Sequence, residues 1–156
     1  MQEKLSTVDA AEVAKFEAMA LEWWDLEGKF KPLHMLNPCR LDYITQQIAS
    51  EFGRNLKEAL PFQGLRILDI GCGTGDFLEV SKSNGWKVVG IEPNDKAKNV
   101  AVKKVNLAKA EVSRFYKNIE DLIDKKGNQQ FDIITMWHVL EHVYDLEDYI
   151  SKLEKL

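Results

Sequence analysis

Cysteine, excess charge and long apolar runs are all scarce in this sequence of 156 residues. Its two cysteines, Cys39 and Cys72, are too few for a disulfide framework and favour reduced thiols in a cytosolic setting. No apolar run reaches the roughly 18 residues of a membrane-spanning helix, and no charged-then-apolar signal precedes the first predicted helix. Repeats and low-complexity tracts are also missing. These absences point away from disulfide-rich secreted scaffolds, membrane-spanning proteins and repeat proteins.

The charge balance argues against a nucleic-acid partner. Lys and Arg number 21 against 25 Asp and Glu, and the net charge of −4 leaves no basic footprint for phosphates. A hydrophobic content of 45% and a charged content of 29% are ordinary for a globular protein. The length is sufficient for one domain with a substantial core.

The second part of the chain alternates short apolar runs with helical patterns. Alternation of this kind predicts an α/β fold with a parallel, doubly wound sheet and right-handed crossovers. The last helix is expected to face inward through Leu146, Tyr149, Ile150 and Leu153. The predicted strands are 65–70, 86–91, 112–116 and 131–136, and the predicted helices before the last are 75–84, 96–109 and 119–125.

The first 60 residues predict a separate helical segment. Asp9 and Glu12 form a capping box for a helix that runs to about Trp24. The two prolines Pro32 and Pro38 predict a loop over 28–38, followed by a second helix over 40–52. The expected organisation is an N-terminal helical segment, 1–60, and a nucleoside-binding domain, 61–156.

The segment Ile67–Gly75 carries the clearest functional signal, because an apolar strand containing Asp69 runs into three alternating glycines. Glu92 ends the next strand 19 residues after Gly73, where an acid can accept hydrogen bonds from ribose hydroxyls. Asp76 stands where dinucleotide sites carry a third glycine, and its charge would repel a pyrophosphate. The pattern favours a cationic ligand such as S-adenosylmethionine, and it resembles the first motif of class I methyltransferases.

The rest of the chain resembles one branch of these enzymes, the ubiquinone-biosynthesis O-methyltransferases of bacteria and mitochondria. The similarity covers nearly the whole chain, although Thr74, Glu92, Trp137 and His138 stand where that family commonly has Gly, Asp, Met and Glu. The residues that carry it are Lys15–Ala18, Trp23–Gly28, Phe30–His34, Asn37–Pro38, Arg40–Leu41, Tyr43–Ile44, Lys98–Val102, Ile119–Leu122 and Leu140–Val143.

The resemblance implies a Rossmann-like class I methyltransferase fold with the strand order 3-2-1-4-5-7-6. Only the 3-2-1-4 part falls within 1–156, because the family continues with further strands after the last helix. The chain is therefore expected to be C-terminally truncated. An apolar edge at its fourth strand and the inner stripe of its last helix would then be exposed and would favour association.

The resemblance also assigns roles to particular residues. Gly71 and Gly73 are expected at the methionine portion of S-adenosylmethionine, and Asp69 at its amino group, directly or through water. Glu92 is expected at the ribose hydroxyls. The remaining assignments are Arg40 at the methionine carboxylate, Asn118 at the adenine edge and Trp137 packed on the cofactor. For each residue a purely structural role in a turn, cap or core remains the alternative.

His138, Glu141 and His142 form an H-x-x-E-H pattern, and on a helix these three side chains would share a face. The spacing is also that of a zinc hydrolase motif, but its position after a strand of a cofactor-binding sheet argues against hydrolysis. Family members with Glu in place of His138 suggest a divalent metal here. His142 and Glu141 are the candidates for the catalytic base, and a merely structural role for them stays open.

The function that the resemblance implies is S-adenosylmethionine-dependent O-methylation of a polyprenylated phenol or catechol in ubiquinone biosynthesis. The expected location is the bacterial cytoplasm or the periphery of the inner membrane, with a small lipophilic phenol and other pathway proteins as partners. Two alternatives stay open: a methyltransferase for another small molecule, and a catalytically inactive fragment that still binds S-adenosylmethionine.

Overall fold

A computed structural model describes residues 27–29, 31–106, 113–125, 130–137 and 139–156. Contacts divide the chain into two units, Met1–Gly53 and Arg54–Leu156. The capping box and the helix predicted to end near Trp24 lie outside the described residues. Within these ranges no helix is both long and apolar enough to cross a membrane.

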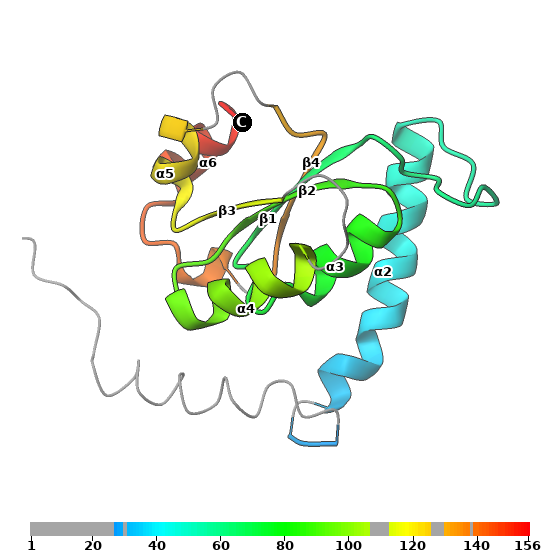
Figure 1. Ribbon diagram of the computed structural model, residues 1–156, viewed down its shortest axis with the longest axis horizontal. Helices are drawn as coiled ribbons and strands as arrows, with labels where there is room; N and C mark the ends of the chain where they lie inside the picture. Colours follow the sequence, from blue (N-terminus) through cyan, green and yellow to red (C-terminus); the bar gives the residue numbers. More distant parts are fainter. Residues whose placement is uncertain (1–26, 30, 107–112, 126–129, 138) are drawn as a thin grey trace, which may run out of the picture. The chain divides into compact units, whose positions relative to one another are not determined.

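In the first unit, the predicted loop over 28–38 is wrong. Helix α2 spans Lys31–Glu51 without a break and contains Pro38 (Figure 1). Pro32 falls in the first turn, where a missing N–H costs nothing because the first amides of a helix have no intrahelical acceptor. Pro38 removes one hydrogen bond within the helix, and the surrounding turns tolerate the loss. Pro32 therefore lies at the beginning of this helix and Pro38 lies within it, so neither marks a loop.

The second unit contains a four-stranded parallel sheet, as predicted. Its order is β3-β2-β1-β4 (Figure 1). The strands are β1, Arg66–Ile70; β2, Lys87–Ile91; β3, Arg114–Tyr116; and β4, Ile133–Met136. In the register, Ile70 lies beside Ile91 in β2 and beside Met136 in β4, so the carboxyl ends of these strands meet at one edge.

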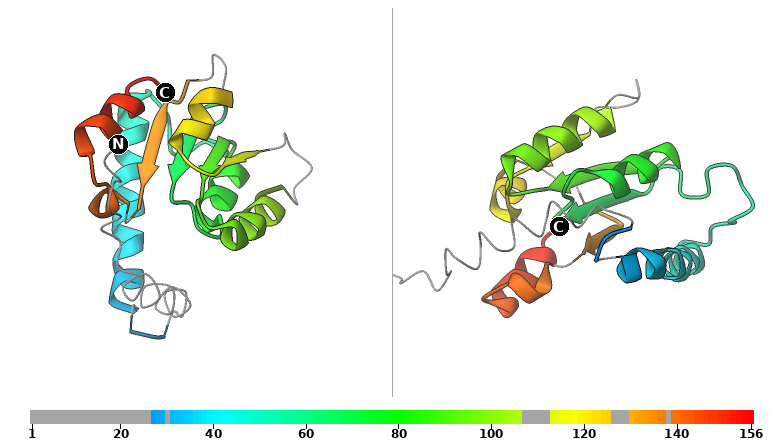
Figure 2. Two further views of the ribbon diagram at one scale, coloured as in Figure 1. Left: turned by 90° about the vertical axis from the view of Figure 1, so that its left-hand side faces the viewer. Right: turned by 90° about the horizontal axis from the view of Figure 1, so that it is seen from below.

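Helices cover both sides of this sheet, and Figure 2 shows α4 and α6 on opposite sides. Most residues of β1 and β2 are buried on both faces, which explains their largely apolar sequences, whereas the residues of β4 are only half-buried. The helices of the unit are α3, Asp76–Ser83; α4, Asp95–Asn106; α5, Ile119–Lys125; and α6, Leu146–Leu153, with a 3₁₀ turn η1 at Leu140–His142.

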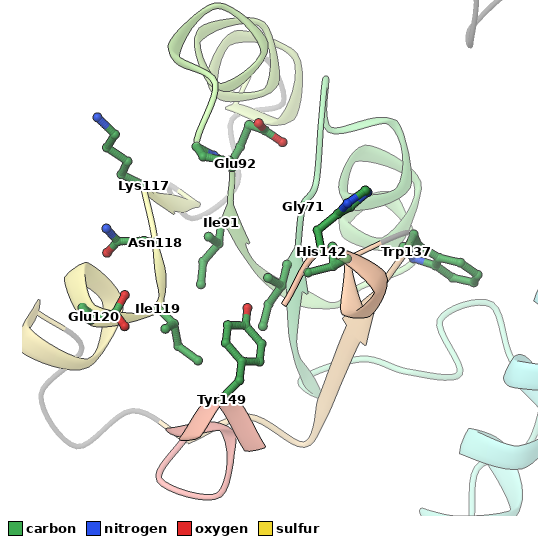
Figure 3. A pocket seen from close by; sticks show the side chains of 13 residues that line it. Gly71, Ile91, Glu92, Lys117, Asn118, Ile119, Glu120, Trp137, His142 and Tyr149 are labelled. Atoms are coloured by element: carbon green, nitrogen blue, oxygen red, sulfur yellow. The ribbon is translucent and has the colours of Figure 1, made fainter. Parts of the chain in front are cut away.

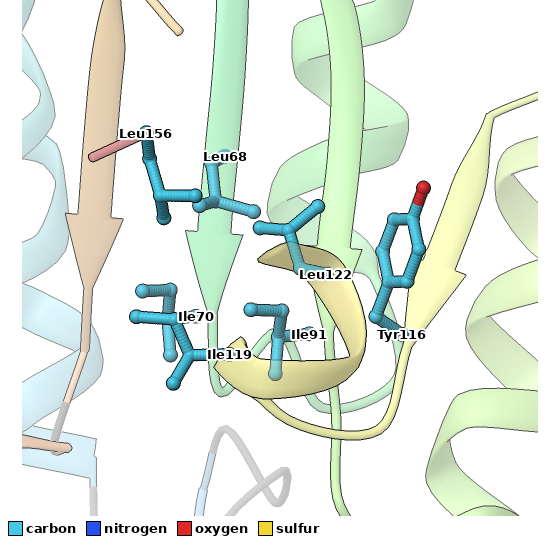
Figure 4. Close-up of a cluster of buried hydrophobic side chains, with 7 residues drawn as sticks. All are labelled: Leu68, Ile70, Ile91, Tyr116, Ile119, Leu122 and Leu156. Atoms are coloured by element: carbon cyan, nitrogen blue, oxygen red, sulfur yellow. The ribbon is translucent and has the colours of Figure 1, made fainter. Parts of the chain in front are cut away.

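The apolar core lies between the sheet and α5 and α6. Leu68, Leu122 and their neighbours are almost fully buried there (Figure 4). Of the four residues expected on the inner stripe of the last helix, Tyr149 and Leu153 pack against this core, whereas Leu146 and Ile150 are exposed. Residues 149 and 153 are four apart and share one helical face, so α6 is held by a narrower stripe than predicted.

Candidate active site

A cavity of about 440 Å³ opens where the strands end. Open α/β sheets place ligands at this edge, outside the carboxyl ends of their strands. Most of its surface is apolar, with Ile91, Ile119 and Tyr149 directed inward (Figure 3). The lining residues are Ile70, Gly71, Ile91, Glu92, Pro93, Lys117, Asn118, Ile119, Glu120, Trp137, Val139, His142 and Tyr149.

The glycine turn after β1 forms one wall. Gly71 has a φ of 74°, and a Cβ there would lie 2.6 Å from Cγ2 of Val139. Only glycine combines this backbone conformation with so close an approach. The amides of Gly71 and Cys72 both donate to the carbonyl oxygen of Ile91, at 2.9 and 3.0 Å. The turn is therefore tied directly to the end of β2.

Gly75 ends the turn and precedes the first residue of α3. Its φ is 81°, and a Cβ would lie 2.9 Å from Cβ of Ala101 and 3.0 Å from Cα of the same residue. Its lack of a side chain lets α3 approach α4 closely. Lys104 of α4 also reaches Asp76 at the start of α3, at 2.7 Å.

Glu92 fastens the glycine turn to the loop that follows β2. One carboxylate oxygen accepts the amide of Gly73 at 2.8 Å, and the other accepts the amide of Asn94 at 2.8 Å. The side chain is buried and still lines the cavity. Each carboxylate oxygen has a second lone pair, so Glu92 can hold the turn and still accept hydrogen bonds from a ligand.

Asp69 lies below the turn and is only 1% exposed. It does not line the cavity, although Gly71 does. Its carboxyl accepts a hydrogen bond from the hydroxyl of Thr135 at 2.8 Å. Burial raises the pKa of Asp69 to about 7; the bond from Thr135 lowers the pKa and the nearby charge of Glu92 raises it.

Cys72 lies close to both acids. Burial raises the pKa of its thiol above the ordinary range, and Asp69 and Glu92 raise that pKa further. A Cβ on Gly90 would come within 2.8 Å of its sulfur, so the bare backbone of β2 makes room for the side chain. A thiol in this surrounding stays protonated and chemically inert.

Asn118 stands at the opposite rim, after β3. Its Oδ1 accepts the amide of Asp121 at 2.8 Å and so caps the beginning of α5. This cap uses the amide oxygen and not the Nδ2 donors. Its neighbour Glu120 is bonded to Lys152 of α6 at 2.7 Å, which joins the two helices at this rim.

The wall after β4 is formed by Trp137, Val139 and His142. The indole ring of Trp137 points away from the cavity and packs edge-on against Phe77 of α3, with ring centroids 5.9 Å apart (Figure 3). Its Nε1 is buried and has no hydrogen-bond partner in the part of the chain that is described. The residue thus contributes to the wall, while its ring faces α3.

The helix expected to align His138, Glu141 and His142 is not formed. A 3₁₀ turn covers only Leu140–His142, Val143 is extended, and His138 is outside the described residues. In a 3₁₀ turn successive side chains are about 120° apart, so Glu141 and His142 point in different directions. Among the described residues no group of three or more potential metal ligands occurs. His142 lines the cavity, and Glu141 does not.

Not all residues predicted to bind the cofactor line the cavity. Gly71, Glu92, Asn118 and Trp137 line one cavity, whereas Gly73 and Asp69 do not line it. Arg40 belongs to α2. The structure describes the backbone of Arg40 but not its side chain. Sequence reasoning missed Thr135 and Tyr149. A hydroxyl within the apolar strand Ile133–Met136 was the available signal for Thr135, and Tyr149 gave none beyond its helical periodicity.

Comparison with solved structures supports the fold. The bifunctional kinase-methyltransferase WbdD is 27% identical, with a TM-score of 0.53 over 74% of this chain and 25% of that chain. The magnesium protoporphyrin IX methyltransferase ChlM from Synechocystis PCC 6803, solved with bound SAM, is 18% identical and has a TM-score of 0.62. That match covers 97% of this chain and 72% of ChlM.

Curated relatives are more similar in sequence. A protein of Ruegeria sp. (strain TM1040) named ubiquinone biosynthesis O-methyltransferase is 48% identical over 100% of this chain and 62% of its own length. A protein of the same name from Cereibacter sphaeroides (strain ATCC 17029 / ATH 2.4.9) is 47% identical over 99% of this chain and 62% of its own length. The chain thus spans about three fifths of the length of these relatives.

A family model described as a methyltransferase domain matches residues 43–156. The match includes the whole sheet, the glycine turn and every residue that lines the cavity. With the strand order 3-2-1-4 and the acid after β2 in place, the chain belongs to the methyltransferase domain family.

Proposed function

We propose that the protein binds S-adenosylmethionine and transfers its methyl group to a hydroxyl oxygen of a polyprenylated phenol or catechol in ubiquinone biosynthesis. The observation that carries the proposal is Glu92, buried at the end of β2 and bonded to the amide of Gly73 in the glycine turn. The relatives named ubiquinone biosynthesis O-methyltransferase support the substrate class.

The cofactor is proposed to lie along the carboxyl ends of β1, β2 and β3. Its ribose hydroxyls would donate to the free lone pairs of Glu92, and Asn118 would offer its amide donors to the adenine edge. Gly71 and Gly73 would lie beside the methionine portion. Asp69 is proposed to act on the amino group from below the turn, and Arg40 to pair with the methionine carboxylate.

In the reaction, the phenol oxygen attacks the methyl carbon of the sulfonium, and the carbon–sulfur bond breaks to leave a thioether. The phenolic proton must be removed, because a phenol with a pKa of roughly 10 is a poor nucleophile at neutral pH. His142, which lines the cavity, is proposed as the base that takes this proton, with Glu141 beside it. Holding oxygen, carbon and sulfur in line supplies most of the rate enhancement.

A divalent metal near His138, Glu141 and His142 remains part of the proposal as an activator of the phenol. The 3₁₀ turn presents His142 alone to the cavity, so a bound ion would need ligands beyond this turn or from the substrate. A polyprenylated substrate partitions into lipid, and the proposal therefore includes a cytoplasmic protein that contacts the bacterial inner membrane peripherally.

Calorimetric titration with S-adenosylmethionine tests the cofactor assignment. Glu92→Ala should weaken binding at least ten-fold, the expected loss for a charged hydrogen-bonding group. The matched control is Glu79→Ala, which removes an exposed carboxylate from the first turn of α3. Circular dichroism confirms that both variants are folded. Unchanged affinity in Glu92→Ala would remove the ribose assignment, and no binding by the wild-type protein would overturn the proposed cofactor.

Methyl transfer to a prenylated catechol tests the reaction. His142→Ala should lower kcat by about 10²-fold or more while KM for the cofactor changes little. Tyr144→Ala, at a residue that is 93% exposed in the same segment, serves as the control. Cofactor binding without transfer to any phenol would favour a catalytically inactive protein that binds S-adenosylmethionine. Transfer to an unrelated small molecule would favour a methyltransferase with a different substrate.

A further inference from the structure

A row of residues crosses the sheet on the side opposite the apolar core. Asp69 in β1 lies beside Thr135 in β4 and beside Gly90 in β2. The adjoining position in β3 is Phe115, whose ring would lie 2.7 Å from a Cβ on Gly90. The row thus contains one hydroxyl and one carboxyl between otherwise apolar residues, and the two are direct neighbours across the strands.

We propose that Thr135 is a positioning residue of the cofactor site, whose hydroxyl holds the Asp69 carboxyl below the glycine turn and favours the ionised form that stabilises a bound cationic ligand. The identity of that ligand rests on the function proposed above. Thr135 itself does not line the cavity and acts only through Asp69.

The geometry of the pair supports this role. The hydroxyl donates to Oδ1 of Asp69 at 2.8 Å, and register fixes the two residues side by side. A β-branched side chain in a strand has a restricted χ1 angle, so the donor is held in place before any ligand arrives. Among the described residues it is the only side-chain donor recorded for the Asp69 carboxyl.

The other titratable groups that face Asp69 do not favour its charge. Glu92 approaches from the end of β2 and Cys72 from the turn, and Glu92 raises the pKa of Asp69. The described residues of α3, α4 and β4 direct no lysine or arginine at the carboxyl. Ionisation of Asp69 therefore depends on the Thr135 hydroxyl and on whatever cation occupies the site.

The first experiment measures the pKa of Asp69 without ligand, by the ¹³C chemical shift of its carboxyl group, with Asp69→Asn for assignment. Thr135→Val, which keeps shape and removes the hydroxyl, should raise this pKa by about one unit, the typical contribution of a hydrogen bond to a charged group. Thr135→Ser restores the donor and should keep the wild-type value. An unchanged pKa in Thr135→Val overturns the inference.

The second experiment compares the Kd of S-adenosylmethionine for the same proteins at pH 7 and pH 9. With a pKa one unit higher, Thr135→Val should bind about five-fold more weakly than wild type at pH 7 and equally at pH 9. Thr135→Ser should bind like the wild type at both. The ligand's own titration is common to all variants and cancels in the ratio.

The two experiments separate the inference from the function on which it rests. An equal loss of affinity at both pH values would indicate a merely structural role for Thr135 and overturn the inference. Absence of binding by the wild-type protein overturns the proposed cofactor, while the carboxyl pKa still tests the pairing of Thr135 with Asp69. Should Thr135→Val fail to fold, Thr135→Ala removes the hydroxyl without the β-branched bulk and takes its place in both measurements.

Discussion

The two walls of the cavity are built differently. On the glycine-turn side, the amides of Gly71 and Cys72 donate to the last residue of β2, and the amide of Gly73 donates to the carboxylate of Glu92. Asp69 and Glu92 are both buried. On the β4 side, the wall is a three-residue turn and a helix that packs through one narrow stripe. Leu140, Leu146 and Ile150 on this side are each more than 40% exposed.

The two walls are therefore held in place by different kinds of interaction. Positive-φ glycines and hydrogen bonds from its backbone amides to Ile91 and Glu92 fix the turn, so its geometry is set mainly by the backbone. The β4 wall depends on side-chain packing against the core, and its outer surface remains uncovered in the described part of the chain. Substitutions on the two sides should therefore lower the free energy of unfolding by different amounts.

The largest effect is expected at the turn. Gly75→Ala should lower the free energy of unfolding by about 3–5 kcal/mol, because a Cβ forces both a disfavoured positive φ and overlap with Ala101 in α4. Urea denaturation measures the change. Gly64→Ala is the matched control: its φ is also positive, 86°, but a Cβ there meets nothing within 4 Å.

That control should cost only about 1–2 kcal/mol, the conformational part alone. A loss of similar size in both variants would mean that α3 and α4 are not closely packed through Gly75. The rigidity assigned to the turn would then come from backbone conformation only, and the contrast with the β4 wall would be weaker.

An effect of intermediate size is expected from the charge below the turn. The pKa of Asp69 is raised from 3.8 to about 7, so between these pH values the folded protein holds a proton that the unfolded chain has lost. The free energy of unfolding should therefore fall as pH rises from about 4 to 7. Above pH 7 the destabilisation caused by Asp69 should stay constant. Asp69→Asn should be about 2–4 kcal/mol more stable than wild type near pH 8 and nearly equal to it near pH 4.

The pH dependence due to Asp69 is measured as the difference in free energy of unfolding between wild type and Asp69→Asn, because other acids change stability with pH in the opposite direction. Hydrogen bonds from Lys98, Lys152 and Lys125 lower the pKa values of Asp95, Glu120 and Asp121 respectively. Those groups contribute stability above their unfolded pKa values that is lost in acid. A difference between wild type and Asp69→Asn that does not vary with pH would show that Asp69 is ionised throughout.

Much of the fold could be predicted from the sequence, because the strands and glycines are local signals. The strand order follows from alternating strands and helices together with the similarity to class I methyltransferases, and the structure confirms it. The extent of α2 was not predictable from proline content alone, since Pro32 is accepted in a first turn and Pro38 is tolerated only through the helix around it.

The candidate site was predictable where a residue type has a fixed place in the motif. Gly71 and Glu92 are such residues, and both line the cavity. The pairing of Thr135 with Asp69 depends on register between strands 66 residues apart, which no local pattern contains. Tyr149 has the same helical spacing as the core residue Leu153, so its direction toward the cavity required the structure.

The smallest effects are expected on α6, where two alanine substitutions divide the helix into its two faces. Leu153 packs against the core, and Leu153→Ala should cost about 1–2 kcal/mol, below the range for full burial because the side chain is only partly buried. Ile150 is 45% exposed, and Ile150→Ala should change stability by no more than about 0.5 kcal/mol. Alanine is the better helix former, which partly offsets each loss and slightly favours the Ile150 variant.

Thermal and urea unfolding at several protein concentrations, with sedimentation in parallel, measure the stability of both variants. Equal costs at all concentrations would contradict the narrow stripe, whereas a cost for Ile150→Ala that appears only at high concentration would show that copies of the chain cover this face.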